Sequence, residues 1–394
     1  MLFKLILSIL FILTFSSYAE QPRDCNWENE SSSPCITITK SVNNTSKFNS
    51  KSVKKNIITR EQIEETGSID LIDVLQSIPS INITQSGPKG QQASMFMRGT
   101  GSNHVLVMIN GVAINDQSTT QGLHDFGVDF IQTIQQVEVY EGPGAANFGP
   151  NAIGGAVNII TTGDLKDNVK FSSRDTENYD FFINKNYIAD NSDLYNLKLG
   201  IIENKTTSAR FPGNEKDGVK NYSGNFNFEK WINNFQVMNS TYIRETEAEY
   251  DNSATKEENY VGNNQMLTTQ FNLNYMTENS KNEFTLYHNL YDREYDEQGV
   301  IDYYDSNATG LKYNFSKFFD NFSYGYGSEY RYDSGDFQNN GSYSASTKGN
   351  YDNISIYGNL GYNLFDNTQL SLFLRNDENK QTGSNQSNKI KFKN

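Results

Sequence analysis

The sequence predicts two architectures in one chain: a small α+β domain, followed by antiparallel strands of the kind that form a transmembrane β-barrel. Helix caps and buried strands are concentrated in residues 57–162, and helix signals end near residue 164. The later residues alternate apolar and polar side chains in strands of roughly 10 residues or slightly more, the length that a tilted membrane strand needs. Residues 137–162 divide the two parts, because their density of Gly and Pro excludes a helix.

Residues 1–19 have the features of a secretory signal peptide. Lys4 is the only charge, residues 5–15 are apolar, and Ser17 and Ala19 are small residues at the positions that signal peptidase recognises. A membrane anchor is the alternative, but the apolar run is too short for one. The sequence therefore predicts export. No Cys follows the expected cleavage site directly, so a lipid anchor is not predicted.

Residues 20–55 form a polar arm without periodicity, typical of a flexible segment. Its two cysteines, Cys25 and Cys35, are predicted to form a local disulfide in an oxidising compartment. A metal site is the alternative, although two thiols without a nearby His make a poor one. A short β-prone piece follows Cys35, and it is either a chance apolar pair or a segment that a partner adds to a sheet edge. Its residues are Ile36, Thr37, Ile38 and Thr39.

Helix signals mark the start of a folded domain. Thr59 is a helix N-cap with Gln62 at the capping-box position, and Gly67 ends that helix. Ser68 is predicted to cap a second helix, which Pro79 stops. A third, short apolar helix is expected at residues 128–134.

Apolar runs and turn signals predict the strands of this domain. The strands are expected at residues 81–83, 95–98, 105–109 and 112–114, with a tight turn at Asn110 and Gly111. Two polar loops, residues 85–94 and 115–125, interrupt them. About a hundred residues with this much Ile and Val can bury a core.

The second part of the chain repeats apolar side chains at every second position. Examples are Leu267, Phe271, Leu273 and Tyr275; Tyr324, Tyr326 and Tyr330; and Ile354, Ile356 and Leu360. Short turns alternate with long polar loops, expected at residues 206–220, 247–264, 293–305 and 333–350. This alternation is typical of outer-membrane barrels, and a soluble sandwich would not sort its loops by parity.

The number of strands predicts that the barrel is incomplete. Counting from residue 169 gives about eleven strands, and residues 390–392 only begin a twelfth. A closed bacterial barrel has an even number of strands, and this chain lacks the final aromatic residue that such barrels usually carry. The sequence therefore predicts a truncated product that covers about half of a barrel of roughly 22 strands.

Charge and residue patterns exclude several function classes. The formal net charge of −14 argues against a nucleic-acid partner, which would need a basic patch. The histidines (His104, His124 and His288) are widely spaced, no Ser stands in a nucleophile elbow, and the Gly-rich stretches lack the Lys of a phosphate loop. The sequence thus predicts neither an enzyme nor a resident cofactor.

One group of carboxylates stands near a predicted long loop. It consists of Glu245, Glu247, Glu249 and Asp251. Carboxylates are the ligands that Ca²⁺ prefers, so the group could bind this ion. The alternative is a solvated set of charges on a polar loop.

Three motifs, in order, carry a resemblance to a known family. They are ITREQIEETGSIDLIDVLQSIPSINI (58–83), FMRGTGSNHVLVMINGVAIND (96–116) and VEVYEGPGAANFGPNAIGGAVNIITT (137–162). Together they resemble the plug domain of TonB-dependent outer-membrane receptors. HVLVMINGVAIND and NFGPNAIGGAVNIITT are most similar to the cobalamin-receptor branch, and siderophore receptors share both phrases. The resemblance implies a plug domain at residues 56–162 and the N-terminal part of a plugged barrel at residues 163–394.

The resemblance also implies a function and a location. The chain would lie in the bacterial outer membrane, in contact with its lipid, and take up a large scarce ligand such as cobalamin or a ferric siderophore. A TonB-type inner-membrane energy-coupling protein would pull on the arm through Ile36–Thr39. The alternative is a non-transporting surface protein, for binding or signalling, with an incomplete barrel. A passive porin fits poorly with a folded plug.

The resemblance places the two polar loops at the outward apex of the plug, facing the ligand. Their neutral donors and acceptors suit a large neutral or chelated ligand, whereas a catecholate or phosphate would need more Arg and Lys. The alternative is a pair of solvated loops. The predicted ligand-binding residues are Gln85, Ser86, Gln91, Gln92, Ser94, Asn115, Asp116, Gln117 and Ser118.

A departure from the family pattern suggests a latch. The family usually has Arg before the Gly-Pro of residues 142–143, and this chain has Glu141. A charge buried between plug and barrel must be paired, and breaking such a pair is costly. We therefore expect Arg98, with Glu138 or Glu141, to form a releasable pair at that interface.

Overall fold

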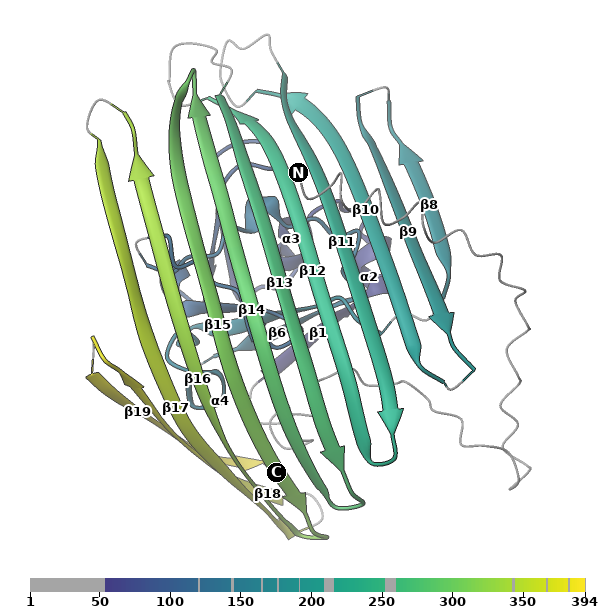
Figure 1. Cartoon of the computed structure of the whole chain (residues 1–394), viewed down its shortest axis with the longest axis vertical. Coiled ribbons are helices and arrows are strands. Elements are labelled where there is room, and N and C mark those ends of the chain that lie inside the picture. Colours follow the sequence, from purple (N-terminus) through teal and green to yellow (C-terminus); the bar gives the residue numbers. More distant parts are fainter. Residues whose placement is uncertain are drawn as a thin grey trace. The chain divides into compact units, whose positions relative to one another are not determined.

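The computed structural model describes residues 54–119, 121–142, 145–163, 166–175, 177–190, 192–208, 216–251, 260–341, 344–365, 368–381 and 383–393 (Figure 1). The predicted signal peptide, the Cys25–Cys35 disulfide and the segment Ile36–Thr39 lie outside the described residues. The described chain begins with a domain of short strands and helices, residues 54–163, which we call the N-terminal domain. A sheet of long antiparallel strands follows, which we call the wall.

The N-terminal domain is built on a five-stranded sheet with the order β1-β6-β7-β4-β5. Its strands are β1 (Lys54–Thr59), β4 (Val105–Ile109), β5 (Val112–Ala113), β6 (Gln136–Glu141) and β7 (Gly155–Ile160). β4 and β7 run parallel, and the other neighbours are antiparallel. A separate hairpin joins β2 (Ile81–Gln85) to β3 (Ala93–Met97). The Gly-rich stretch thus supplies both β6 and β7, the centre of the sheet.

Three short helices complete this domain. They are α2 (Arg60–Glu65), α3 (Leu71–Gln76) and α4 (Ala145–Phe148). The predicted capping box of α2 is confirmed, since Thr59 and Gln62 exchange both hydrogen bonds. The predicted cap of α3 is wrong: Asp70, not Ser68, accepts the amide of Asp73, because the helix begins only at Leu71 and Asp70 directly before it is extended. Two single 3-10 turns are η2 (Ser102–His104) and η3 (Phe126–Val128).

The predicted third helix, at residues 128–134, is also wrong. The chain there forms only η3, a bridge from Asp70 to Phe130 and a turn. Its apolar side chains are nevertheless buried, so the apolar pattern was real but had no helical period.

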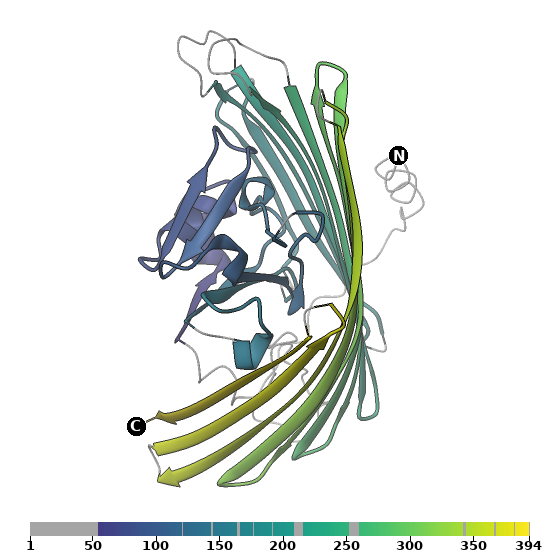
Figure 2. The same cartoon turned by 90° about the vertical axis from the view of Figure 1, so that its left-hand side faces the viewer.

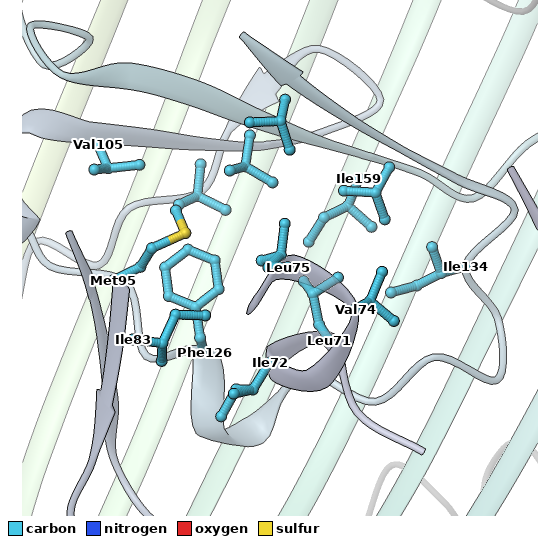
Figure 3. Packing of buried hydrophobic residues seen from close by; sticks show 14 of the residues in the cluster. Leu71, Ile72, Val74, Leu75, Ile83, Met95, Val105, Phe126, Ile134 and Ile159 are labelled. Atoms are coloured by element: carbon cyan, nitrogen blue, oxygen red, sulfur yellow. The ribbon is translucent and has the colours of Figure 1, made fainter. Parts of the chain in front are cut away.

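The core of the N-terminal domain lies between α3, the β2–β3 hairpin and the five-stranded sheet (Figure 3). α3 alone buries four apolar side chains, Leu71, Ile72, Val74 and Leu75. The wall adds only Tyr242, Met266 and Tyr291 to this cluster. The domain therefore has a core of its own, and truncating Leu75 to Ala would cost about 2–5 kcal/mol.

The wall is one twelve-stranded antiparallel sheet in which every strand pairs with its neighbours in sequence. The strands are β8 (Asn168–Ser173), β9 (Tyr179–Ile188), β10 (Leu194–Thr207), β11 (Lys216–Ile232), β12 (Phe235–Tyr250), β13 (Tyr260–Met276), β14 (Ser280–Glu297), β15 (Val300–Phe318), β16 (Phe322–Asn339), β17 (Ala345–Phe365), β18 (Thr368–Asn379) and β19 (Gly383–Lys393). The prediction of about eleven strands missed one, because β19 is polar over most of its length and lacks the apolar alternation.

The wall has two chemically different faces, and the N-terminal domain contacts the polar one (Figure 2). One face exposes large apolar side chains, such as Phe271, Leu286 and Leu311, which are direct cross-strand neighbours of one another. The alternate positions carry Asn, Thr, Gln and Arg, which are buried where the N-terminal domain covers them. The predicted alternation is thus confirmed. In the described part of the chain, no helix is long and apolar enough to cross a membrane.

Two of the long loops predicted in the wall are strands instead. β14 continues to Glu297 and β15 starts at Val300, so the expected loop 293–305 shrinks to a turn at Gln298 and Gly299, which both have positive φ. Likewise, β16 and β17 pair over most of residues 333–350. The polar residues misled the prediction, because strands that extend beyond an apolar band are free to be polar on both faces.

Candidate functional site

Glutamine side chains hold the first polar loop of the N-terminal domain, residues 85–94, in its conformation. Gln85 donates through Nε2 to the carbonyls of Pro88 and Gln91, at 2.9 and 3.3 Å. Gln91 is buried and donates across to the Glu249 carbonyl of β12. Ser86 and Gln92 are exposed, and Ser94 is half-buried. Of the residues predicted in this loop, the structure thus leaves Ser86 and Gln92 free to meet a ligand.

Lys89 fixes this loop to the start of α3. Its ammonium lies 2.5 Å from Asp70 and 2.8 Å from Asp73. Burial alone would lower the pKa of Lys89, but the hydrogen bonds and charges of the two carboxylates outweigh burial and raise the pKa. The loop is therefore anchored on both sides, to α3 by an ion pair and to the wall by Gln91.

The second polar loop, residues 115–125, is largely buried against the wall. The side chain of Asn115 accepts a hydrogen bond from the Val107 backbone amide and donates to the carbonyls of Val105 and Gly122. All three hydrogen bonds lie inside the domain. Gln117 accepts the hydroxyl of Tyr351 of β17 at 2.7 Å. Asn115, Asp116 and Ser118 are all buried, which contradicts the exposure to ligand expected of them.

Asp116 forms the first ion pair between the N-terminal domain and the wall. Its carboxylate lies 2.8 Å from the Arg293 guanidinium of β14, and both side chains are at most 6 % exposed. The same carboxylate accepts the hydroxyls of Ser118 and of Ser306 on β15. Arg293 also donates to Ser118. Each charge is thus paired and hydrogen-bonded, as a buried ion pair requires.

Asp129 forms the second ion pair, with Arg244 of β12. His124 lies on the other carboxylate oxygen, with its Nε2 2.6 Å away. Burial would raise the pKa of Asp129, but the charges of His124 and Arg244 outweigh it and hold the pKa below its ordinary value. Arg244 also donates to Asn264 of β13. The carboxylate therefore stays ionised in the folded protein at neutral pH.

Hydrogen bonds outside these ion pairs join the two parts further along the wall. Asn110, at the turn after β4, donates to Ser240 of β12 and to Thr161 at 2.9 Å each. The ammonium of Lys198 on β10 donates to the Thr161 carbonyl at 2.9 Å. These groups are buried, so each bond also satisfies a polar group that would otherwise be costly to enclose.

The predicted latch residues lie elsewhere. Glu138 is buried inside the N-terminal domain, where it pairs with Lys55 of β1 at 2.6 Å and accepts the Tyr140 hydroxyl. Glu141 accepts the Asn56 amide, also from β1. Arg98 is exposed, in a turn with φ of 53°. The buried ion pairs between the domain and the wall are instead Asp116–Arg293 and Asp129–Arg244.

The sequence predicted Asp116 as a ligand-binding residue and did not single out Asp129, Arg244 or Arg293, because each partner is far away in sequence. A signal did exist: Arg244 and Arg293 stand at the polar positions of strands whose other face is apolar. A charge at such a position needs a buried partner, but the sequence does not say which.

A cavity of about 120 Å³ lies between the N-terminal domain and the wall. The domain side is mostly apolar, with Leu106, Met108 and Val112. The wall side is polar and includes Glu283, Lys312, Glu329 and Arg375. Within the wall, Glu329 accepts the Tyr287 hydroxyl at 2.9 Å.

The carboxylates predicted to bind Ca²⁺ have other partners in the structure. Glu247 pairs with Lys220, and Glu249 accepts the Gly218 amide. Within the described ranges, no group of three or more His, Cys, Asp or Glu is arranged to hold a metal ion. Calcium binding stays a prediction.

Comparisons with known proteins agree with this architecture. Residues 48–156 match the family model described as TonB-dependent Receptor Plug Domain. The ferric yersiniabactin uptake receptor of Yersinia pestis superposes with a TM-score of 0.66 at 16% identity, over 87% of this chain and 62% of that one. The siderophore receptor PirA of Acinetobacter baumannii gives a TM-score of 0.67 at 18% identity, over 87% and 59%.

A third similar structure is a mutant of the ferric enterobactin receptor of Pseudomonas aeruginosa. Its TM-score is 0.67 at 15% identity, over 90% of this chain and 61% of that one. The chain thus spans about three-fifths of the length of these receptors. It carries the plug domain of TonB-dependent receptors, and its wall has the fold of their barrels, which confirms the predicted fold class. Receptors of this class are transporters rather than enzymes.

Proposed function

We propose that this chain acts in TonB-dependent uptake across the bacterial outer membrane, for a large ligand of the ferric siderophore or cobalamin type. One observation supports this most strongly. The N-terminal domain has its own core, and apart from a small apolar cluster of Ile69 and Phe130 with Ile202, Val219 and Ala248 of the wall, it is joined to the polar face by hydrogen bonds and two buried ion pairs. Such contacts can be exchanged for water without unfolding the domain, so the domain can shift and let a ligand pass.

The proposal includes three partners: membrane lipid, a TonB-type protein and the ligand. Membrane lipid covers the apolar face of the wall, which exposes Phe271, Leu286 and Leu311. A TonB-type inner-membrane protein would pull on the arm that precedes Lys54, by adding Ile36–Thr39 to one of its sheets. The ligand would meet the exposed Ser86 and Gln92 of the first polar loop.

Replacing Ile38 by Pro tests the role of the arm. Pro lacks the amide that strand addition needs, so energised uptake should fall at least about tenfold while ligand binding is unchanged. The measurement is uptake by cells that lack other receptors, with ferric trihydroxamate, ferric tricatecholate and cyanocobalamin as probes. Ile38→Val, which keeps the amide and the β-propensity, is the matched control and should transport normally.

Two outcomes would contradict the proposal. If none of the probes is bound or taken up, the proposed ligand class is wrong. If a probe is bound but never taken up, even with an intact arm, the chain is a binding or signalling protein of the surface and not a transporter.

A further inference from the structure

Two segments of the N-terminal domain that are far apart in sequence, residues 69–71 and 129–131, lie side by side in antiparallel pairing. Two backbone hydrogen bonds of 2.9 and 3.2 Å join them. Their partners are the Leu71 amide with the Asp129 carbonyl, and the Ile131 amide with the Ile69 carbonyl. We call the two segments together the junction. The first segment leads into α3 and the second follows η3 directly, so the junction holds these two elements together.

The junction rests on the wall through both apolar and charged side chains. Phe130 is 1 % exposed, and it packs with Ile69 in an apolar cluster whose wall members lie on β10, β11 and β12. Those wall members are Ile202, Val219 and Ala248. Asp129, the neighbour of Phe130, forms the buried ion pair with Arg244. The distance between Asp129 and Arg244 is therefore set by how the junction lies on the wall.

The first polar loop lies against the same part of the wall. A Cβ on Gly90 would come within 2.5 Å of Val219 and 3.1 Å of Ala248, two of the wall residues that pack against the junction. The preceding residue, Lys89, places its ammonium 2.5 Å from Asp70 of the junction. The loop and the junction thus share wall contacts and are joined to each other by an ion pair.

Asp70 depends on Lys89 because its carboxylate is buried. The Asp70 side chain is 3 % exposed, and in the described part of the chain its ion-pair partner is Lys89. Its other carboxylate oxygen accepts the Asp73 amide at 3.0 Å. Without the ammonium, this carboxylate would be enclosed without a counter-charge, and it would have to move outward to regain water. Such a movement would pull Asp70 away from Phe130, its partner in the junction.

We propose that Lys89 is a positioning residue for the Asp129–Arg244 ion pair. It holds Asp70 in the junction, and the junction in turn keeps Asp129 opposite Arg244, so the coupling passes through groups that are in contact throughout. A displacement of the first polar loop that removes Lys89 from Asp70 therefore loosens the hold of the N-terminal domain on the wall. The inference goes beyond the proposed function, because it concerns the protein without ligand and without an energy-coupling partner.

Hydrogen–deuterium exchange of the whole purified chain in detergent tests the inference. Its readout is the pair of amides that close the junction, those of Leu71 and Ile131, which we call the junction amides. Lys89→Met keeps the aliphatic stem of the side chain and removes its charge. The junction amides should then exchange at least about tenfold faster, because the junction opens more often. Lys89→Arg keeps the charge and should keep their exchange within about threefold of the wild type.

A reciprocal effect separates positioning of the ion pair from simple support of α3. If Lys89 and Arg244 are coupled, a change at either one must alter the surroundings of the other. Arg244→Met should therefore speed exchange of the Gln91 amide, which donates to Pro88 within the first polar loop, by about threefold or more. In the double variant Lys89→Met, Arg244→Met, the acceleration of the Leu71 amide should be smaller than the product of the two single accelerations, because both changes weaken the same contacts.

Two variants serve as matched controls. Lys216→Met removes an exposed ammonium of the wall that pairs with the exposed Glu177, and it should leave the junction amides unchanged. Asp73→Asn removes the second partner of Lys89, which is 45 % exposed, and should change their exchange by less than about threefold, because water can replace it. If Lys89→Met does not fold, Lys89→Gln, which keeps a hydrogen-bond donor without the charge, is read at the same two amides.

The inference is overturned if the junction amides of Lys89→Met exchange within about threefold of the wild type. It is also overturned if Arg244→Met leaves the Gln91 amide unchanged, or if the two single effects simply multiply in the double variant, because Lys89 would then only support the start of α3. Transport is tested separately. None of these measurements includes a ligand or an energy-coupling partner, so their outcome and the outcome of the uptake experiment are independent.

Discussion

Single residues decide how firmly the N-terminal domain is held. Asp129 and Asp116 are both buried carboxylates that meet an Arg of the wall, but their other partners differ. Asp129 has a His on its second oxygen, whereas Asp116 has two Ser hydroxyls. Both arrangements satisfy the carboxylate fully. Removing either carboxylate takes away the ion-pair partner of a buried Arg, which costs far more than breaking an exposed pair would.

Replacing Asp129 by Asn should therefore lower the free energy of unfolding of the N-terminal domain by about 3–5 kcal/mol, because Arg244 loses its counter-charge. Urea denaturation followed by circular dichroism measures the loss. The double variant Asp129→Asn, Arg244→Met removes both charges and should recover most of the stability. An equal loss in the double variant would show that the side-chain shapes matter and the charges do not.

The same carboxylate sets the response to acid. Its pKa in the folded protein is below the ordinary 3.8, so ionisation stabilises the fold above that value. The stabilisation is fully present at neutral and mildly acidic pH and is lost only as the pH falls through the lowered pKa. The stability difference between wild type and Asp129→Asn should persist from pH 7 to about pH 5 and should shrink in stronger acid. A difference that disappears already near pH 6 would contradict this assignment.

Elements of the two parts fit together through glycines at close contacts. A Cβ on Gly335 of β16 would lie 2.4 Å from the Gln117 carbonyl, and one on Gly90 would lie 2.5 Å from Val219 of β11. The second polar loop can therefore approach the wall only where β16 lacks a side chain. The need for glycine at residue 335 arises from the contact between β16 and the second polar loop, and neither element shows this need by itself.

Gly335→Ala should force the second polar loop away from β16 and expose its backbone. Limited proteolysis should then cut within residues 115–125 several-fold faster than in the wild type. Gly349→Ala is a matched control. Gly349 of β17 pairs directly with Gly335 of β16, and no atom lies within 4 Å of the position that its Cβ would take. Equal cutting of both variants would mean that the loop does not depend on this contact.

At the scale of elements, the sequence predicted what local patterns encode. The capping box at Thr59 and Gln62 needs only its own turn, and it was predicted correctly. The turn at Gln298 and Gly299 was hidden because polar residues on both sides of it resemble a loop. Only the pairing of β14 with β15, residue by residue up to Glu297 and Val300, makes those residues strands.

The whole molecule is organised by a wall with one apolar and one polar face. Leu311 lies near the middle of β15 on the apolar face, 52 % exposed, whereas Lys312 beside it lines the cavity on the polar face. Such a wall suits the membrane location proposed above, in which one face meets lipid and the other meets a polar domain or water. The N-terminal domain provides part of that polar surface.

Leu311→Arg should therefore weaken membrane assembly by about 2–4 kcal/mol, the cost of Arg at the middle of the bilayer on a lipid-facing position. Tyr303→Arg, on the same face of β15 but near its end, should cost only about 0–1 kcal/mol. Folding into lipid vesicles as a function of urea measures both. Equal costs at the two depths would contradict a membrane-spanning wall.

The sequence by itself determined the division into two architectures, the positions of most strands and the two faces of the wall. These features depend on neighbours in the chain, which turns, caps and alternation report directly. Only the tertiary structure decided which charges hold the N-terminal domain. Asp129 and Arg244 are 115 residues apart, and the chain holds many other Asp and Arg residues with which either could have paired. Folding selects one pair because only it places both charges at the same buried point, where neither could remain alone.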